Sequence, residues 1–395
     1  MSYSQETSLI LDSPRGKDYT SANQPLYYSS TYHQEVLGGA ADYDYARSGN
    51  PNRSLLEEKL ANLEGGNHGF AFSSGIAAIT AVFMTLKAGD HVILPDDVYG
   101  GTYRLTERIF RRFGIDFTTV DQTDLGAIAR AVQPNTQLIY VETPSNPLFK
   151  VTDISGVSQI AKDNDVLLAV DNTFMTPLGQ SPFKHGADIV IHSATKFLSG
   201  HSDLIAGAVI VNCPKLAEDI YLIQNGTGSG LGVYDAWTLT KNLKTLAVRF
   251  NQSVTNAEKV CRFLKQHPAV ATVYYPADSD IHVKQAVNGG AVIGFRLADE
   301  TQAQTFVDNV TLLLVSVSLG GVETILSHPA TMSHAAIPEL VRRQRGITQG
   351  LFRLSVGLEN AEELILDLQQ ALETTINRQR NNKKKQYVSQ CYTNQ

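Results

Sequence analysis

The segment 193–200 (SATKFLSG) places Lys196 among hydroxyl side chains, directly after the apolar run Ile189–Ile191. Such a run is typical of a buried strand, and burial lowers the pKa of an ammonium group because it disfavours the charged form. A neutral lysine amine can bond covalently to a carbonyl carbon. The hydroxyls of Ser193 and Thr195 and the backbone N–H groups beside them suit a phosphate. Taken alone, the same segment also fits a helix cap followed by a surface lysine.

A second strand-like run, VLLAVD, ends at Asp171. A carboxylate at the carboxyl edge of a sheet can pair with a cationic ring nitrogen, which is the partner that the pyridinium of pyridoxal 5'-phosphate (PLP) requires. Asp171 could equally cap a turn that contains Asn172 and Thr173. Neither run decides between these alternatives alone.

Two further segments have residue types that suit a cofactor site. The segment 73–76 (SSGI) lies where a strand should give way to a helix. Free N–H groups and the positive end of a helix bind anions there, and glycine allows close approach of the backbone. Tyr99 follows the next predicted strand, and its aromatic face could stack on a planar ring. An ordinary helix cap and a core tyrosine are the alternatives.

The elements that must position these residues alternate along residues 55–211. Apolar runs of strand length are separated by stretches with helical periodicity. The expected strands are Phe70–Phe72, His91–Leu94, Leu138–Val141, Val166–Val170, Ile189–Ile191 and Ala206–Val211, and the expected helices are Leu55–Leu63, Ile76–Lys87, Leu105–Phe113 and Val157–Asn164. This alternation predicts an α/β fold with a mostly parallel sheet covered on both faces. Chemistry in such sheets lies beyond the carboxyl ends of the strands, where Glu142, Asp171 and His192 fall.

Changes in residue composition and periodicity divide the chain into four parts. Residues 1–45 are expected to form an N-terminal arm, 46–233 a large cofactor-binding domain, 234–378 a smaller α+β domain, and 379–395 a polar, disordered tail with a basic run. In the smaller domain we expect helices at Trp237–Phe263, Thr301–Asn309 and Ala361–Arg378 and strands at Val270–Tyr274 and Val292–Leu297. The glycine-rich stretch 226–232 does not fit a GxGxxG nucleotide motif, and we interpret it as a flexible loop.

Composition excludes several classes of protein. Hydrophobic residues make up 43% and charged residues 18% of the chain, which is too apolar for a disordered protein. The net charge of −6 lacks the basic footprint of a protein that binds nucleic acid or an anionic membrane. The three cysteines form no CxxC motif, the histidines lack metal-ligand spacing, and no secretory signal is evident. We therefore expect a cytoplasmic protein without a metal.

Eight motifs, taken in order, make the chain similar to a known family. They are YDYARSGNPNR (43–53), AFSSGIAAI (71–79), DDVYGGTYR (96–104), ETPSNP (142–147), VDNTF (170–174), ADIVIHSATKFLSGHSD (187–203), SLGGVET (318–324) and FRLSVGLE (352–359). Together they resemble the Cys/Met-metabolism PLP enzymes, which include cystathionine β- and γ-lyases, cystathionine γ-synthase and methionine γ-lyase. The resemblance implies the aspartate-aminotransferase fold (fold type I) with a sheet of the seven-stranded type. It also implies a homotetramer built from dimers that share active sites.

The resemblance further implies roles for individual residues. Lys196 would hold the cofactor covalently and move protons, Asp171 would pair with the pyridine nitrogen, and Tyr99 would stack on the ring. The other residues implied to contact the cofactor are Ser74, Gly75, Ile76, Thr173, Ser193 and Thr195, together with Tyr45 and Arg47, which would reach the phosphate in a neighbouring subunit. The α-carboxylate of an amino-acid substrate would be held by Asn146, Ser318 and Arg353, a bidentate task that suits arginine.

The motifs define the substrate less narrowly than the cofactor. Gly101 stands where methionine γ-lyases usually have a cysteine, which argues against that activity. Glu323 resembles γ-lyases, γ-synthases and many Gram-positive β-lyases, and Asp44 and Arg104 could contact the distal ammonium and carboxylate of cystathionine. We therefore predict cleavage of L-cystathionine, with β-elimination slightly favoured over γ-elimination. Cystathionine γ-synthase or O-acylhomoserine sulfhydrylase activity is the alternative, and a catalytically silent binding protein of this fold is a third hypothesis.

Overall fold

The computed structural model describes residues 4–10, 22–36, 38–39, 41–335 and 337–392. The helices within them are α1 Gln5–Ile10, α2 Pro51–Glu64, α3 Gly75–Phe83, α4 Gly100–Arg108, α5 Leu125–Ala131, α6 Ile154–Asp163, α7 Thr176–Gly179, α8 Pro214–Thr227, α9 Val233–Leu243, α10 Leu246–Gln266, α11 Asp280–Gln285, α12 Ala303–Asn309, α13 Glu339–Gln344 and α14 Ala361–Tyr392. The strands are β1 His68–Phe72, β2 His91–Pro95, β3 Asp116–Val120, β4 Thr136–Glu142, β5 Leu167–Asp171, β6 Ile189–His192, β7 Gly207–Val211, β8 Val270–Tyr274, β9 Val292–Leu297, β10 Leu314–Val315, β11 Ile325–Ser327 and β12 Leu351–Ser355. Short 3₁₀ helices are η1 Phe110–Phe113, η2 Pro182–His185, η3 Pro276–Asp278 and η4 Glu300–Gln302.

These elements form two compact units. The larger unit contains the residues up to Asn251 together with Pro276–Gly290, and the smaller unit contains Gln252–Tyr275 and the residues from Ala291 onward. The helix α10 belongs to both units, so the chain divides within a helix. The sequence pattern instead changes at residue 234.

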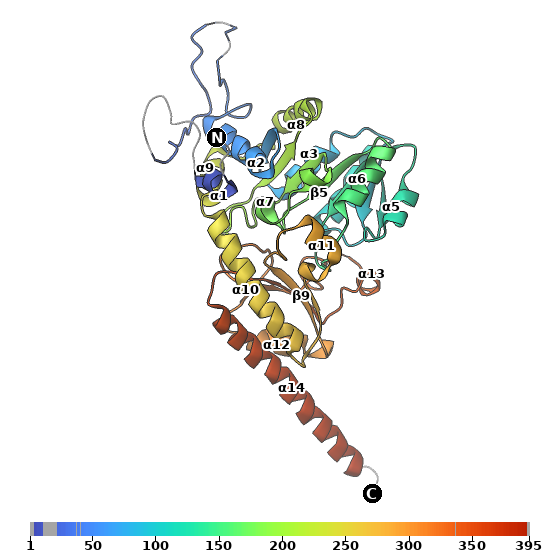
Figure 1. Cartoon of the computed structure of the whole chain (residues 1–395). Coiled ribbons are helices and arrows are strands. Elements are labelled where there is room, and N and C mark those ends of the chain that lie inside the picture. Colours follow the sequence, from blue (N-terminus) through green and yellow to red (C-terminus); the bar gives the residue numbers. More distant parts are fainter. Residues whose placement is uncertain (1–3, 11–21, 37, 40, 336, 393–395) are drawn as a thin grey trace. The chain divides into compact units, whose positions relative to one another are not determined.

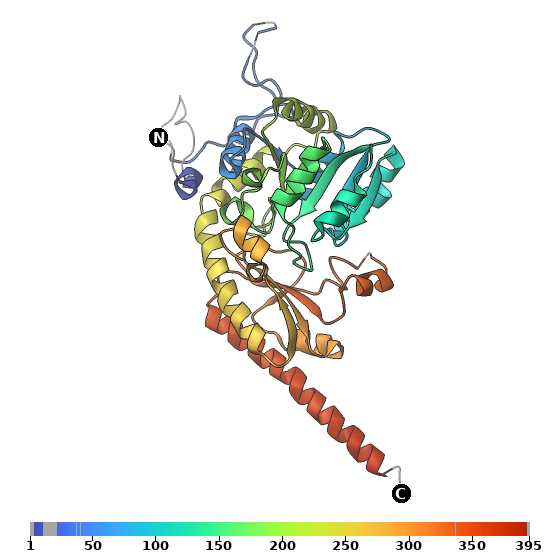
Figure 2. The same cartoon turned by 45° about the vertical axis from the view of Figure 1, so that its right-hand side comes forward.

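The larger unit is built on a seven-stranded sheet with the strand order β1-β7-β6-β5-β4-β2-β3. The five strands from β2 to β6 pair in parallel, whereas β7 pairs antiparallel with both β6 and β1. Helices lie between the parallel strands along the chain and cover the sheet (Figures 1 and 2). The prediction of an α/β fold on a mostly parallel, seven-stranded sheet is therefore confirmed.

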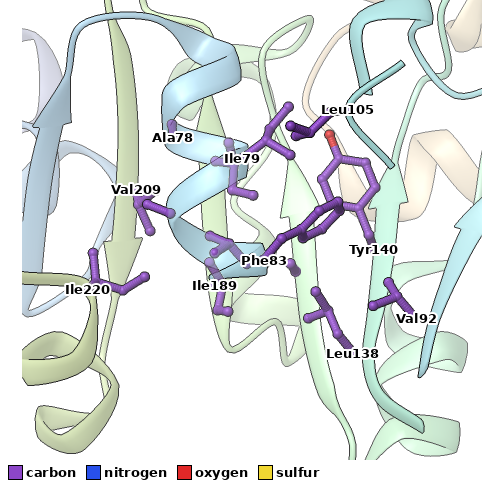
Figure 3. Close-up of a cluster of buried hydrophobic side chains, with 14 of the residues drawn as sticks. Ala78, Ile79, Phe83, Val92, Leu105, Leu138, Tyr140, Ile189, Val209 and Ile220 are labelled. Atoms are coloured by element: carbon purple, nitrogen blue, oxygen red, sulfur yellow. The ribbon is translucent and has the colours of Figure 1, made fainter. Parts of the chain in front are cut away.

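One face of the large sheet packs against α3, α4 and α8. Figure 3 shows part of this cluster, in which Ile79 and Phe83 of α3 lie among Leu138, Tyr140 and Ile189 of the strands. The rings of Phe83 and Tyr140 meet edge to face, with their centroids 5.9 Å apart. Fully burying one such side chain contributes about 1.5–3 kcal/mol, so this packing fixes α3, and with it the segment that begins the helix, against the sheet.

The smaller unit has its own five-stranded sheet, with the strand order β10-β11-β12-β9-β8. Its pairs are antiparallel except for β10 with β11. Buried side chains of α10, α12 and α14 pack against this sheet, and the rings of Phe295, Phe306 and Phe352 contact one another. The strands β10 and β11 were not predicted because they have only two and three residues, and the five-residue strand β12 was not predicted either.

Several helix boundaries differ from the sequence predictions. The helix expected at Leu105–Phe113 begins earlier, at Gly100, and gives way to η1 after Arg108. Glycines are poor helix formers, which masks this start in the sequence. The single helix expected at Trp237–Phe263 is two helices, α9 and α10, separated by a short break.

The glycine-rich stretch 226–232 is only partly a loop. The helix α8 continues to Thr227, and Gly228 ends it in the left-handed conformation with a φ of 68°. Glycine adopts this conformation without strain and is therefore the usual residue after a helix. The prediction of a flexible loop over the whole stretch was wrong at its first two residues.

Both ends of the chain also differ from expectation. The arm contains the helix α1, although residues 1–3, 11–21, 37 and 40 of it lie outside the described residues. The last helix, expected to end at Arg378, continues to Tyr392, so the backbone of 379–392 is helical where a disordered tail was expected. This segment contains no proline or glycine and is rich in lysine and glutamine, which favour helix. In the part of the chain that the structure describes, every helix is too short or too polar to cross a membrane.

Candidate active site

Three neighbouring parallel strands end together at one edge of the large sheet. The last residues of β4, β5 and β6 are Glu142, Asp171 and His192. The register of β4 and β5 pairs Glu142 directly with Asp171. The loops that follow these strands therefore start from one place, and they carry Asn146, Thr173, Ser193, Thr195 and Lys196, as expected for the carboxyl edge of a parallel sheet.

The carboxylate of Asp171 is held by neighbouring donors. The backbone N–H and the hydroxyl of Thr173 both donate to Oδ1, at 3.0 Å and 2.5 Å, and the hydroxyl of Tyr140 donates to Oδ2 at 3.1 Å. A carboxylate offers about four lone-pair sites, so acceptor capacity remains on this partly buried group. The Thr173 hydroxyl also accepts a hydrogen bond from the backbone N–H of Ser193, at 2.8 Å. This bond ties the end of β5 to the segment that follows β6.

The start of α3 lies against the segment that follows β6. Ser74 is the N-cap of α3, and its hydroxyl accepts a hydrogen bond from Ala77 N at 3.1 Å. A Cβ on Gly75 would lie only 2.7 Å from the Cβ of Ser193, so glycine is needed for this approach. A Cβ on Gly207 would likewise lie 2.1 Å from the carbonyl oxygen of Ser74. The structure thus brings Ser74, Gly75 and Ser193 together at a helix N-terminus, where anions bind.

Lys196 lies in the turn that follows β6 and is partly buried. Its backbone N–H donates to the carbonyl of Ser193 at 3.1 Å, and its own carbonyl accepts from Gly200 N at 2.7 Å. Thr195 is bonded to Ala206 in both directions: its N–H donates to Ala206 O at 3.1 Å, and its hydroxyl accepts from Ala206 N at 2.9 Å. The turn is therefore fixed to the segment that leads into β7.

Glu142 connects two of the predicted site residues. Its Oε2 accepts a hydrogen bond from the backbone N–H of Tyr99 at 3.1 Å, and its Oε1 accepts from the backbone N–H of Asn146 at 3.0 Å. Burial and, secondly, the charge of Asp171 raise the pKa of Glu142 well above its usual range. One buried carboxyl group thus sets the backbone positions of the predicted ring-stacking residue and of a predicted substrate-binding residue.

Tyr99 precedes α4 and exposes 40% of its surface. A Cβ on Gly101 would lie 2.4 Å from an edge carbon of the Tyr99 ring. With this orientation of Tyr99, any larger residue at Gly101 would require the ring to move. The ring is thus held beside the glycine in a residue that is partly exposed to solvent.

Four predicted site residues of the larger unit lie on its surface. Asp44, Tyr45, Arg47 and Arg104 are all exposed. The guanidinium of Arg47 lies 5.8 Å from the centre of the Tyr45 ring, within the range of a cation–π contact. These side chains are not anchored to the sheet edge.

The remaining predicted residues belong to the smaller unit. Arg353 lies on β12, is buried, and donates from Nη2 to the carbonyl oxygen of Ser318 at 2.5 Å and to the hydroxyl of Ser327 at 3.2 Å. Ser318 has a φ of 80°, a conformation that costs a non-glycine residue of order 1–3 kcal/mol and is often found at functional sites. Glu323 is exposed. The structure therefore brings Arg353 and Ser318 together within one unit.

The sequence analysis missed one side chain that organises this edge, and it placed a second, Glu142, there without its contacts. Tyr140 lies in a continuous apolar strand, where it passes for a core residue, yet its hydroxyl binds Asp171. The other is the clamp that Glu142 forms, because a strand-end carboxylate gives no sign of which backbone groups it will bind. A tyrosine in an otherwise aliphatic strand was the available signal for the first.

The described residues fit PLP at three points. The N-terminus of α3 beside Ser193 offers backbone and hydroxyl donors to a phosphate. Asp171 retains acceptor capacity for a protonated ring nitrogen. The exposed ring of Tyr99 can cover a planar heterocycle.

Comparisons with known proteins agree with this chemistry. The model of the family "Cys/Met metabolism PLP-dependent enzyme" matches residues 6–373. The cystathionine β-lyase MetC of Staphylococcus haemolyticus is 68% identical to this chain, and the match covers 95% of the chain and 96% of that protein. The cystathionine γ-lyase of Bacillus subtilis is 46% identical, with coverages of 93% and 99%.

A solved structure extends the likeness to the fold. The crystal structure of cystathionine γ-lyase from Lactobacillus plantarum complexed with L-serine matches with a TM-score of 0.91 and 42% identity, and it covers 94% of this chain and 99% of that one. The resemblance of the motifs and the type I fold are therefore confirmed. Because the family model spans nearly the whole sequence, this chain belongs to the Cys/Met metabolism PLP-dependent enzyme family.

Proposed function

We propose that this protein is a PLP-dependent carbon–sulfur lyase that cleaves L-cystathionine by β-elimination to homocysteine, pyruvate and ammonia. The identity of 68% to a cystathionine β-lyase, against 46% to a cystathionine γ-lyase, supports β- over γ-elimination. The observation that carries the proposal is the sheet edge, where Asp171 keeps acceptor capacity within one hydrogen-bonded chain that also includes Thr173 and Ser193.

PLP, when bound, supplies an electron sink for negative charge that develops on the substrate's α-carbon. Lys196 would hold the cofactor covalently, and its Nζ, when free, would accept the α-proton of the substrate. Asp171 keeps a positive charge on the ring nitrogen by accepting its hydrogen bond. Tyr99 stacks on the ring and holds it in one plane.

The phosphate of the cofactor is bound by the N-terminus of α3 and the segment after β6. Ser74, Gly75 and Ile76 offer the first backbone N–H groups of the helix, and Ser193 and Thr195 offer hydroxyls. Tyr45 and Arg47 bind the phosphate of a neighbouring copy, which is consistent with their exposure on this chain. The working form is then a homotetramer of dimers that share active sites, in the cytoplasm.

The substrate carries a carboxylate and an ammonium at each end, so it needs recognition at both. Arg353, Ser318 and Asn146 bind the α-carboxylate near the reacting carbon. The short contact from Arg353 to the Ser318 carbonyl supports this pairing, because it fixes the guanidinium against a backbone group in a buried setting. Glu323, Arg104 and Asp44 are exposed and bind the distal groups of cystathionine.

The product identifies the reaction. The protein, saturated with PLP, is incubated with L-cystathionine, and the keto acid is identified by mass spectrometry. Pyruvate with homocysteine supports the proposal, whereas 2-oxobutyrate with cysteine means γ-elimination. Turnover of an O-acylhomoserine with a thiol or cysteine, without cleavage of cystathionine, would show a synthase or sulfhydrylase. A protein that takes up no PLP, seen as the lack of a visible absorption band that borohydride bleaches, would be a silent binding protein.

A further inference from the structure

The guanidinium of Arg249, on α10, is buried and hydrogen-bonds to neutral groups, although the negative charge of Asp203 also acts on it. Its Nη1 donates to the carbonyl of Phe197 at 2.9 Å, and its Nη2 donates to the carbonyls of Leu198 at 3.4 Å and Asn242 at 3.0 Å. Its Nε donates to the hydroxyl of Thr245 at 3.0 Å. Burial lowers the pKa of Arg249 to about 10, so the group still carries its charge at neutral pH.

A buried charge is costly, so its place in the fold calls for an explanation. Two of the carbonyls that Arg249 binds belong to the residues directly after Lys196. These hydrogen bonds are charge-assisted, and such bonds are roughly twice as strong as bonds between neutral groups. Arg249 therefore holds the peptide groups immediately beyond the lysine.

Gly200 shows how closely this turn is fitted to the arginine. A Cβ on Gly200 would lie 1.8 Å from Nη1 of Arg249, and the residue has a φ of 74°, which favours glycine. The N–H of Gly200 donates to the carbonyl of Lys196 at 2.7 Å and closes the turn. Ser199 in the same turn accepts from the side chain of Asn242 at 3.2 Å and donates to Asp203 at 3.0 Å. The turn that begins at Lys196 is thus held from the side of α9 and α10.

We propose that Arg249 is a positioning residue for Lys196: it fixes the backbone turn 196–200 and so sets where the lysine amine stands. The inference rests on the proposed role of Lys196 as the residue that binds the cofactor and moves the α-proton. Arg249 hydrogen-bonds to the backbone beyond the lysine, and it acts through this backbone. An error of about 1 Å in the position of a catalytic group can lower a rate about 10²-fold, so such a clamp has a direct effect on turnover.

The test compares three variants of the PLP-saturated enzyme. Arg249→Met removes the charge and the hydrogen-bond donors but keeps an unbranched side chain. Arg249→Lys keeps the charge but lacks the planar set of donors of the guanidinium. His91→Gln is the matched control, because His91 is buried at the start of β2, at the opposite end of the strands, where it bonds to Thr136 and Thr118, both at 2.8 Å. Readouts are kcat and KM separately, the visible circular dichroism of the bound cofactor, and the peptide labelled by borohydride.

We expect Arg249→Met to retain the cofactor on Lys196 while kcat falls about 10²-fold, KM changes by less than about threefold, and the visible dichroism changes in sign or amplitude. Arg249→Lys should fall between this variant and the wild type. His91→Gln should lower the thermal midpoint but leave kcat and the dichroism unchanged. Arg249→Lys carries the same test on its own if Arg249→Met does not fold.

Two results would overturn the inference. One is a wild-type dichroism and a kcat within about twofold in the arginine variants, with only the thermal midpoint lowered, which would make Arg249 merely structural. The other is an equal loss of kcat in His91→Gln. Borohydride labelling of a residue other than Lys196 in the wild type would instead contradict the proposed function, so the two failures are distinguishable.

Discussion

The sheet edge and the exposed segment 41–49 are both predicted to contact PLP, but they are built differently. At the edge, Asp171, Thr173 and Ser193 form one hydrogen-bonded chain, and Glu142 clamps the backbone on either side. In the exposed segment, Tyr45 shows 48% of its surface, and Asp44 and Arg47 are exposed as well. The edge is held by hydrogen bonds among its own side chains and backbone, whereas the side chains of Tyr45 and Arg47 are exposed on this chain.

This contrast follows from the free-energy cost of an unpaired polar group, which is high in a buried setting and low in an exposed one. Buried polar groups must find hydrogen-bond partners, so the edge is held by its own chain. Exposed arginines and tyrosines have water as a partner and need no such order. If dimers share active sites, the residues that a chain contributes to its neighbour's site should be those it leaves exposed, and Tyr45 and Arg47 match this description.

The largest effect should come from the edge, at Lys196. Lys196→Ala should lower turnover of cystathionine by about 10²–10⁴-fold or more, because covalent binding and proton transfer are both lost. The fold should persist, since the lysine is only partly buried. Activity is measured by keto-acid release, and cofactor attachment by borohydride reduction and peptide mass spectrometry.

Lys215→Ala is the control for this change, because Lys215 is exposed and paired with Asp219 at 2.9 Å. It should keep full activity and full labelling. A Lys196→Ala protein within about tenfold of the wild-type rate would contradict the assigned role, since tenfold corresponds to only about 1.4 kcal/mol of barrier.

The second-largest effect should come from Arg353, which is buried in the smaller unit and contacts Ser318. Arg353→Lys keeps the charge but cannot bind a carboxylate in a bidentate manner, and a charge-assisted hydrogen bond contributes about 1.5–3 kcal/mol. We expect KM for cystathionine to rise about 10–100-fold, with a smaller change in kcat. Steady-state kinetics check this, and an unchanged KM would remove Arg353 from the substrate site.

How far the sequence predicts this molecule depends on the kind of feature. Lys196 and Asp171 were placed correctly at strand ends because continuous apolar runs mark buried parallel strands, whatever their partners are. The hydroxyl of Tyr140 on Asp171 depends on strand order and register, which no local pattern encodes. The same holds for Arg249, whose acceptors Phe197 and Leu198 lie about fifty residues earlier in the chain.

Errors in the predicted elements have equally local causes. The helix α4 begins at two glycines, which propensity alone would exclude, and its place is set by packing of Leu105 in the core of the larger unit. Tertiary packing overrides weak propensity in such cases. Whether Tyr45 and Arg47 reach another copy depends on a surface that a single chain does not contain.

The third prediction tests the exposed segment directly. Arg47→Ala should weaken PLP binding about 10–100-fold through loss of a charge-assisted hydrogen bond, and so lose activity at limiting PLP. Lys196→Ala chains and Arg47→Ala chains are unfolded together, reassembled in equal amounts and assayed at limiting PLP, where neither variant alone is active. A mixed dimer then has one intact site. Random pairing then restores about a quarter of wild-type activity.

The outcome of this mixing separates the two regions. Recovery means that Arg47 and Lys196 of different chains build one site, as the exposure of the segment suggests. No recovery, with mixed oligomers demonstrated by mass spectrometry, would place Arg47 in its own chain's site and remove the contrast. Mixing Lys196→Ala with Asp171→Ala is the control, because both residues belong to the edge and no mixed site is intact.

The smallest effect on catalysis should come from Asp97, a buried carboxyl group beside the edge that contacts the hydroxyl of Ser145. Burial raises the pKa of Asp97 to about 6, while Ser145 and Lys150 oppose the shift. The folded state therefore binds this proton more tightly than the unfolded state does, and the stability contributed falls as pH rises from about 4 through 6. Between pH 4 and 7 the loss should be on the order of 2 kcal/mol.

Asp97→Asn should abolish this loss while kcat stays within about threefold of wild type. The measurement is the thermal midpoint of the PLP-saturated enzyme at several pH values, taken as the difference between wild type and variant, so that the other titrating groups cancel. The thermal midpoint of the variant should rise relative to that of the wild type as pH rises. A difference independent of pH would mean that Asp97 titrates alike in both states and that the edge tolerates its charge. The hydrogen bonds of the sheet edge would then hold it in place whether or not the nearby carboxyl group of Asp97 is ionised.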